Sequence, residues 1–257
     1  MSLHVETHGS GPIPLVMLHG WAMHGGIFGP LIDALRDHCT MHVVDLPGHG
    51  FSRGCGLPLE AHACARAIAD ATPPAIWLGW SLGGSIALAA ALDFPQQVRA
   101  LAMLCATPRF VSDSDWPQGR DPSLVRQLAT DLETDYHATI ERFLALEVMG
   151  SPDPRSELRK LREEVFARGE PDLRVLQEGI RVLDDTDLRS ELPHLPPARS
   201  WWSAGRLDRL VHPSAMQWSA QASQGEFHLI QHAGHAPFLS HAPAVAQTLL
   251  PWLETLA

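Results

Sequence analysis

Three side chains of this sequence have the chemistry, and the order along the chain, of a nucleophilic triad. Ser81 lies in Gly79-Trp80-Ser81-Leu82-Gly83, between an apolar run and a segment of small residues. A serine flanked by such glycines at a turn from strand to helix presents its hydroxyl on a strained backbone. Asp208 and His235 each follow a later apolar run. A serine becomes a strong nucleophile when a histidine takes its proton and a carboxylate orients that histidine, so we predict catalysis by Ser81, His235 and Asp208.

Other residues compete for two of these roles. His232 lies shortly before His235 and is the alternative base, while Asp185 and Asp187 are the alternative acids. The late histidines also suggest a metal site, which would be formed by His228, His232, His235 and His241. No thiolate or carboxylate accompanies them at a familiar ligand spacing, so we expect no metal ion. We also expect no organic cofactor, because the triad and two backbone hydrogen-bond donors suffice for acyl transfer.

The oxyanion formed during acyl transfer needs hydrogen-bond donors close to the nucleophile. The backbone N–H of Leu82, directly after the serine, is one candidate. The other is the N–H of Trp21 in His19-Gly20-Trp21, and the indole of Trp21 would then line the acyl pocket. The alternative for Trp21 is a core aromatic residue. We interpret the glycine-containing loop 45–52 as structural, with His49 as a surface or rim histidine.

Apolar runs alternate with helical patterns over most of the chain. We expect strands at 15–18, 41–44, 75–78, 100–104, 200–203 and 227–230. Strands separated by helices predict an α/β fold with a mostly parallel sheet flanked by helices. Because the C-terminal ends of parallel strands share one edge, the loops that carry Ser81, Asp208 and His235 can converge there.

The alternation of strands and helices stops after Cys105. From about 122 to 188 the apolar residues recur at helical spacing, in segments separated by Gly150-Ser151-Pro152 and Gly169-Glu170-Pro171. This pattern indicates four amphipathic helices in succession. We therefore predict a core formed by residues 1–110 and 190–257, with residues 111–189 inserted as a helical lid.

Composition excludes several classes of function. The chain has 257 residues, 45% of them hydrophobic, and its formal net charge of −10 argues against general binding of nucleic acid. No apolar run is long enough to span a membrane, and no signal peptide is evident at the start. The four cysteines lack a C-x-x-C spacing, as expected for free thiols in a reducing compartment. We expect a cytoplasmic monomer that binds neither nucleic acid nor a membrane.

The motifs together resemble the α/β-hydrolase superfamily across nearly the whole chain. Several segments are more specific and are similar to the pimeloyl-[acyl-carrier protein] methyl ester esterases of biotin synthesis. They include residues 77–84, 141–146, 148–150 and 233–243. The resemblance implies hydrolysis of the methyl ester of a pimeloyl chain on acyl carrier protein, with release of methanol. It also implies substrate contacts at Trp21, Ser81, Leu82, Phe143, Leu144, Ala145, Leu146, Glu147 and His235.

The sequence departs from the pattern of this family at two places in the lid. Glu147 stands where the family has glutamine, and Ala138 stands where an arginine is expected. The resemblance implies docking of the acidic carrier protein by Arg142, Arg155 and Arg159. The alternative is a solvated helix face on which arginines alternate with Glu157, Glu163 and Glu164.

Two other functions are compatible with the same motifs. A general carboxylesterase, or another Ser-His-Asp enzyme of this fold such as a C–C bond hydrolase, would not depend on carrier protein. A non-catalytic ligand-binding homologue is the third hypothesis. Such homologues usually lose a member of the triad, and this chain has a candidate for every member.

Overall fold

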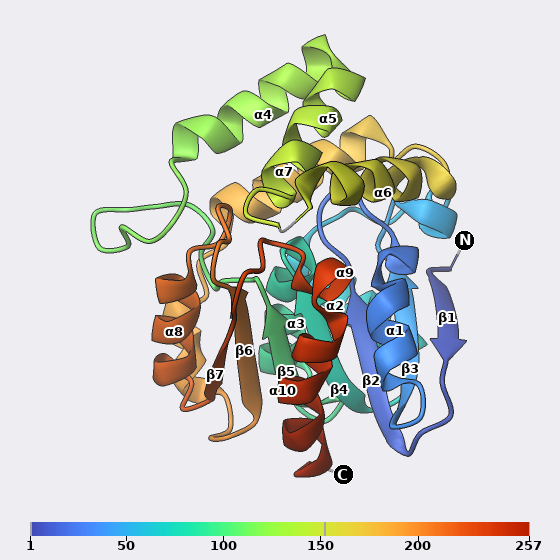
Figure 1. Ribbon diagram of the computed structural model, residues 1–257, viewed down its shortest axis with the longest axis vertical. Helices are drawn as coiled ribbons and strands as arrows, with labels where there is room; N and C mark the ends of the chain where they lie inside the picture. Colours follow the sequence, from blue (N-terminus) through green and yellow to red (C-terminus); the bar gives the residue numbers. More distant parts are fainter. Residues whose placement is uncertain (1, 152, 257) are drawn as a thin grey trace.

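A seven-stranded sheet forms the centre of the molecule (Figure 1). The computed structural model describes residues 2–151 and 153–256. The strand order is β1-β3-β2-β4-β5-β6-β7, with β1 antiparallel to β3 and all other neighbours parallel. The bounds of the strands are β1 His4–His8, β2 Ile13–Leu18, β3 Cys39–Asp45, β4 Ala75–Trp80, β5 Val98–Leu104, β6 Ser200–Gly205 and β7 Glu226–Ile230. The predicted α/β fold with a mostly parallel sheet is confirmed.

Most of the strands that the sequence predicts are buried within the sheet, whereas β7 is an edge strand that is only partly buried. All six residues of β4 are buried, as are all six of β6, and such strands appear in a sequence as continuous apolar runs. The sequence analysis missed β1. This edge strand, His-Val-Glu-Thr-His, is only partly buried and has a single apolar residue, so it carries no comparable signal.

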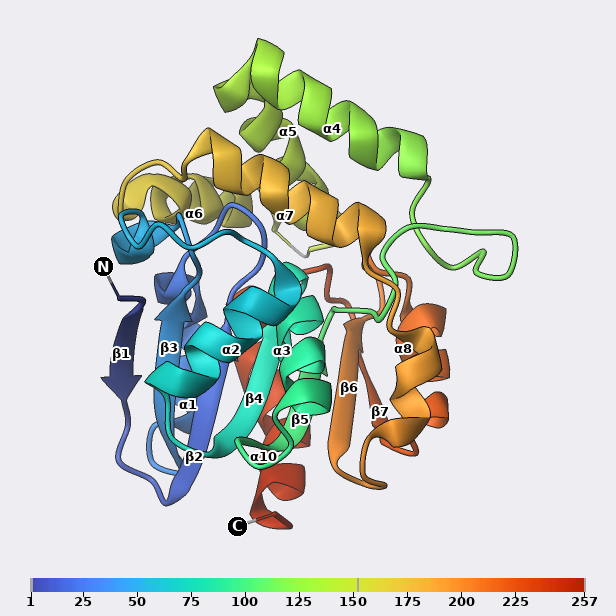
Figure 2. The same cartoon turned by 180° about the vertical axis from the view of Figure 1, so that it is seen from behind.

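Helices cover both faces of the sheet. α1 and α10 lie on one face, and α2 and α3 lie on the other, as the two opposite views show (Figures 1 and 2). The helices of this part are α1 Gly29–Leu35, α2 Ala61–Ala71, α3 Leu82–Asp93, α8 Pro213–Ala222, α9 Pro237–Ser240 and α10 Ala242–Glu254, with short 3₁₀ turns η1 Gly25–Phe28, η2 Gly50–Ser52 and η3 Arg189–His194.

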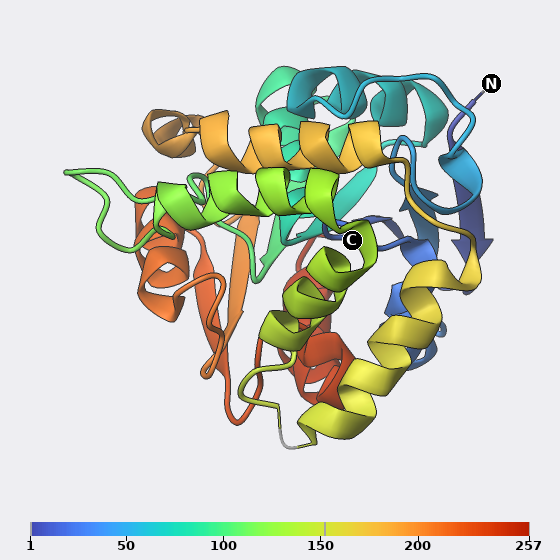
Figure 3. The same cartoon turned by 90° about the horizontal axis from the view of Figure 1, so that it is seen from above.

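Four further helices lie together over the C-terminal edge of the parallel strands (Figures 1 and 3). They are α4 Pro122–Thr134, α5 Tyr136–Glu147, α6 Pro154–Ala167 and α7 Leu173–Asp185, and we call them the lid. An aspartate caps the start of each one by accepting a backbone N–H from the first turn, namely Asp121, Asp135, Asp153 and Asp172. The four helices match the predicted number, and the domain boundaries near 110 and 190 stay a prediction.

None of the helices in the described residues has both the length and the apolar character of a transmembrane span.

Candidate active site

Ser81 occupies a sharp turn between β4 and α3. Its backbone has φ 54° and ψ −123°, a conformation that is costly for a residue with a side chain. The glycines on either side permit this turn. A Cβ on Gly79 would lie 2.5 Å from the carbonyl oxygen of Gly83, and a Cβ on Gly83 would lie 2.3 Å from that of Leu18. The strand, the turn and the helix therefore pack too closely for any residue but glycine at these positions.

The predicted triad residues form one continuous chain of hydrogen bonds. Ser81 Oγ lies 2.9 Å from His235 Nε2, and His235 Nδ1 lies 2.9 Å from Asp208 Oδ2. The other carboxylate oxygen, Asp208 Oδ1, accepts the backbone N–H groups of Leu210 and Val211 at 2.8 and 3.0 Å. With Asp208 accepting from Nδ1, the neutral imidazole leaves Nε2 free to accept the serine proton.

Neighbouring strands hold the loops of Asp208 and His235 together. β6 and β7 are adjacent and parallel, and Gly205 at the end of β6 pairs with Ile230 at the end of β7. A Cβ on Gly205 would lie only 1.9 Å from the carbonyl oxygen of Gly234, so glycine is required for the two loops to meet. The indole of Trp80 also donates to the carbonyl of His235 at 2.9 Å, which ties the histidine loop to the serine turn.

The two predicted oxyanion donors lie beside the serine turn. Neither the N–H of Trp21 nor that of Leu82 has an acceptor among the residues that the structure describes. Leu82 is also the first residue of α3, where the helix dipole favours negative charge. His19 fixes the Trp21 loop by accepting the N–H of Leu46 at 2.9 Å and bonding the carbonyl of Gly20 at 2.8 Å. Burial, together with the nearby His49, lowers the pKa of His19 to about 3, so His19 remains neutral.

Trp21 joins the core to the lid. Its side chain is fully buried, its indole donates to the carbonyl of Leu176 in α7 at 2.9 Å, and its ring meets Phe143 of α5 edge-on at 4.7 Å. The side chain is therefore a buried aromatic residue in contact with the lid, and its role in lining an acyl pocket stays a prediction.

The lid segment 143–147 presents only part of its length to the core. Phe143, Leu144 and Glu147 are buried, whereas Ala145 and Leu146 are exposed, as expected for a helix that packs on one side. Substrate contacts along this segment, as at the other residues named from the resemblance, stay a prediction. In the part of the chain that the structure describes, neither of the buried carboxyl oxygens of Glu147 has a hydrogen-bond partner. Burial, and then the charge of Asp208, raises the pKa of Glu147 well above its usual value.

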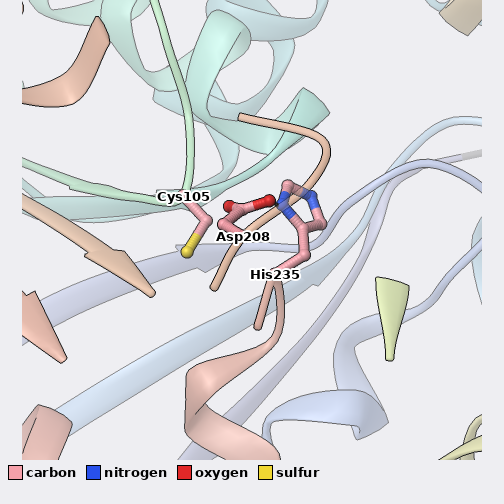
Figure 4. Close-up of side chains that lie close together, drawn as sticks. All are labelled: Cys105, Asp208 and His235. Carbon is pink, nitrogen blue, oxygen red and sulfur yellow. Dashed lines mark hydrogen bonds and ion pairs between the residues drawn. The ribbon is translucent and has the colours of Figure 1, made fainter. Parts of the chain in front are cut away.

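Cys105 lies beside the His235–Asp208 pair (Figure 4). Its sulfur and one atom of each of the other two residues lie within 4.8 Å of one another, close enough for a metal ion to bridge them. The donor chemistry does not favour this. Burial, and then the charge of Asp208, raises the pKa of the Cys105 thiol well above its usual value, which opposes the thiolate that a metal needs. His235 and Asp208 are also already bonded to each other. No pattern in the sequence indicates that Cys105 adjoins the triad.

The alternative candidates for the base and the acid lie outside the hydrogen-bonded chain of Ser81, His235 and Asp208. His232 is exposed, whereas His235 is fully buried against Ser81. Asp185 and Asp187 line a surface cleft of about 580 Å³ between α2 and α7, and Asp187 pairs with arginines at positions 109 and 189.

The expectation that His49 is a surface or rim histidine is wrong. Its side chain is fully buried, next to His19, and burial lowers its pKa to about 4. The loop 45–52 packs against the start of α7, where the carbonyl of Gly48 accepts the N–H of Asp172 at 3.2 Å. Its glycines allow tight turns that a sequence reading cannot distinguish from those of an exposed loop.

The lid arginines differ in their partners. Arg142 pairs with Asp131 at 2.9 Å within the lid. Arg155 and Arg159 are exposed on α6, and no acidic side chain pairs with them in the described part of the chain. An arginine with an acidic neighbour has less charge to offer a partner, so Arg155 and Arg159 are the better candidates for docking.

A buried polar contact that the sequence did not reveal fixes the end of α6. Arg168 donates to Asp45 at 3.2 Å and to Glu6 at 2.9 Å. Asp45 also accepts the backbone N–H groups of Gly25 and Phe51 at 2.7 and 2.8 Å. These groups outweigh burial and hold the pKa of Asp45 below its usual value. We call Arg168, Asp45 and Glu6 the α6 clamp.

Comparison with known proteins agrees with this geometry. The model of the Alpha/beta hydrolase family matches residues 15–248. A curated pimeloyl-[acyl-carrier protein] methyl ester esterase from Stenotrophomonas maltophilia is 52% identical, covering 99% of this chain and 98% of the relative. One of the same name from Xanthomonas oryzae pv. oryzae is also 52% identical, covering 96% and 97%.

Solved structures share the fold at much lower identity. An esterase from Exiguobacterium antarcticum has a TM-score of 0.85 at 22% identity, covering 98% of this chain and 95% of its own. The enol-lactonase from Burkholderia xenovorans has a TM-score of 0.82 at 19% identity, covering 98% and 96%. At this identity the likeness shows the fold alone. The family model and the curated relatives show more: the chain belongs to the alpha/beta hydrolase family, among the pimeloyl-[acyl-carrier protein] methyl ester esterases.

Proposed function

We propose that this protein is a serine carboxylesterase that hydrolyses the methyl ester of pimeloyl-[acyl-carrier protein] to pimeloyl-[acyl-carrier protein] and methanol in biotin synthesis. The observation that carries the proposal is the chain of hydrogen bonds from Ser81 through His235 to Asp208, found in a protein about half identical to esterases of that name. We further expect it to act in the cytoplasm as a monomer, without a metal ion or an organic cofactor.

The first half of the reaction transfers the acyl group to the enzyme. Ser81 Oγ attacks the ester carbonyl carbon while His235 Nε2 takes its proton, and Asp208 stabilises the imidazolium that forms. The carbonyl oxygen becomes an oxyanion, which the N–H groups of Trp21 and Leu82 stabilise. The intermediate then collapses, the carbon–oxygen bond to the methoxy group breaks, and His235 gives its proton to the departing methanol.

The second half returns the enzyme to its starting state. A water molecule gives its proton to His235 and attacks the acyl carbon of the ester on Ser81. The same two N–H groups stabilise the second oxyanion. When this intermediate collapses, Ser81 leaves with the proton from His235 and the product is a carboxylic acid. Over the two steps one water is consumed, one methanol and one carboxylic acid are released, and His235 and Ser81 regain their starting protonation, so the reaction requires no further reactant.

Recognition of the carrier is assigned to the exposed arginines of α6. The protein has a formal net charge of −10, so a strongly acidic partner is repelled except where a local patch is basic. Arg155 and Arg159 lie one turn apart and present such a patch. Arg142 stays in the proposed docking set with a smaller contribution, because it already pairs with Asp131.

A comparison of substrates tests the proposal. We expect kcat/KM for the pimeloyl methyl ester on carrier protein to exceed that for dimethyl pimelate, with no hydrolysis of either by Ser81→Ala. Equal values for the two esters would favour the general carboxylesterase instead. Binding of the carrier-bound ester without turnover would favour a non-catalytic role.

A further inference from the structure

Glu147 is a buried acid that the mechanism above does not use. Its side chain is 1% exposed, and neither carboxyl oxygen has a hydrogen-bond partner within residues 2–151 and 153–256. It is the last residue of α5 and lies one turn after Phe143, on the same buried side of the helix. Phe143 contacts Trp21 beside the oxyanion loop. Glu147 therefore belongs to the side of the lid that faces the proposed catalytic centre.

The end of α5 touches both loops that carry the histidine and the acid. A Cβ on Gly150 would lie 2.5 Å from Leu207 Cβ, and Leu207 directly precedes Asp208. A Cβ on Gly234 would lie 2.8 Å from the carbonyl oxygen of Met149 and 3.4 Å from that of Glu147. Gly234 directly precedes His235. A movement of this end of the lid would thus change the support of Asp208 and of His235 together.

The surroundings of Glu147 oppose a negative charge. The loops and helices packed around the end of α5 carry these titratable or charged groups: Cys105, Glu157, Arg206, Asp208, Arg209, His232 and His235. Arg206, Arg209 and His232 are exposed. The charge that acts on Glu147 is that of Asp208, which has the same sign as a carboxylate at 147. A buried carboxylate without a partner costs several kcal/mol, so the group either stays neutral or leaves its site.

We propose that Glu147 is a positioning residue for the Asp208–His235 pair. As a neutral acid it lets the end of α5 seat on the two loops, and as a carboxylate it forces that end away from Asp208. The inference rests on the proposed function, because Asp208 and His235 are catalytic only if that proposal holds.

The sign of the pH dependence follows from the raised pKa of Glu147. The seated lid binds the Glu147 proton more tightly than the displaced or unfolded lid does. The seated state is therefore fully favoured below the ordinary pKa of a glutamic acid and is lost as pH rises through the higher pKa of the seated state. Glu147→Gln keeps the shape and removes the ionisation, so its lid should stay seated at every pH.

The test measures methanol release from methyl butyrate as a function of pH for the wild type and Glu147→Gln. The ratio of kcat/KM, variant over wild type, should rise with pH, by up to about tenfold for each pH unit once Glu147 is ionised. Glu178→Gln is the matched control, because Glu178 is also a glutamate of the lid but lies on α7 and has hydrogen-bond partners in Leu59 and Arg174. Its pH profile should follow that of the wild type.

A second measurement does not depend on activity. Carbon-13 labelling of the glutamate carboxyl groups should show one that titrates above the rest, and Glu147→Gln should lack that signal. Parallel pH profiles for wild type and Glu147→Gln, or a Glu147 signal that titrates with the others, would overturn the inference. If the wild type hydrolyses no ester, the proposed function fails, and the carboxyl titration still decides the protonation of Glu147.

Discussion

Two of the buried contacts between the lid and the rest of the protein differ in how they accommodate a carboxyl group. At the end of α6, the carboxylate of Asp45 is 1% exposed and has Arg168 and two backbone N–H groups as partners. At the end of α5, the carboxyl group of Glu147 is equally buried and has none among the described residues. The first site can keep its charge because hydrogen bonds replace the lost water, whereas the second cannot.

This difference suggests a division of labour within the lid. The α6 clamp, with His24 donating to the carbonyl of Glu164 at 2.6 Å, fixes one end of the lid to the sheet. The end of α5 lies on the loops of Asp208 and His235 and is held there only while Glu147 is neutral. With the end of α6 held by the clamp, the lid can open at the end of α5 without detaching from the core.

The largest expected effect on activity comes from substitution of Asp208, the acid whose charge acts on Glu147. Asp208→Asn should lower ester turnover about 10⁴-fold with the fold intact, because the amide no longer stabilises the imidazolium of His235. The same change removes the charge that opposes ionisation of Glu147, so the pKa of Glu147 should fall. Initial rates and the carboxyl titration measure the two effects. Asp187→Asn is the control, and near-normal activity in folded Asp208→Asn would move the acid role to Asp187 or Asp185.

The next largest effect tests the fixed end. Arg168→Met should lower the free energy of unfolding by about 2–3 kcal/mol, since it leaves the buried charge of Asp45 without its cation. Arg159→Met removes an exposed arginine from the same helix and should change stability by less than about 0.5 kcal/mol. Urea denaturation of both variants provides the comparison. Equal losses would mean that the clamp contributes no more than an ordinary surface charge.

The two ends should also respond to pH in opposite directions. The pKa values of Asp45 and Glu6 are held low, so stability at the α6 clamp is present above their ordinary values and is lost as pH falls through the lowered ones. Burial likewise lowers the pKa of His24, and its protonation in acid adds to this loss. The end of α5 should instead loosen as pH rises, because the pKa of Glu147 is raised.

Amide hydrogen exchange, corrected for its intrinsic pH dependence, measures this opposition. Protection of residues 160–168 should fall in acid, and protection of residues 144–150 should fall as pH increases. Changes in the same direction at both segments would contradict the comparison.

The smallest expected effect concerns the outer surface of α6. Reversing the charges of Arg155 and Arg159 to glutamate should weaken turnover of the carrier-bound methyl ester about tenfold, most clearly at low salt. Turnover of methyl butyrate should barely change, since the triad is untouched. Reversal of Arg66 and Arg99, exposed arginines of the core, is the matched control. Equal losses on both substrates would show that the arginines support the lid rather than dock a partner.

Local patterns in the sequence predicted much of the fold and the candidate site. Ser81, Asp208 and His235 each follow a strand of the parallel part of the sheet, and parallel strands bring such positions to one edge, so their proximity could be inferred. The edge strand β1 could not be predicted, because a half-solvated strand needs few apolar residues.

Contacts between distant polar residues left no trace in the sequence. Asp45 and Arg168 lie 123 positions apart, and nothing local to either one indicates the other. The sequence predicts a surface or rim position for His49, because loops usually lie at the surface, but the start of α7 packs against this loop. Likewise, the sequence does not indicate that the carboxyl group of Glu147 has no hydrogen-bond partner among the described residues, because this depends on what surrounds the end of α5 in space.

The most direct test of the central claim is the intact mass of the carrier protein after incubation of its pimeloyl methyl ester with the purified enzyme. The account predicts a carrier that has lost one methyl group and kept its acyl chain, together with released methanol. Ser81→Ala should leave the mass of the carrier unchanged. An unchanged mass with the wild type, or equal demethylation by folded Ser81→Ala, would contradict the account.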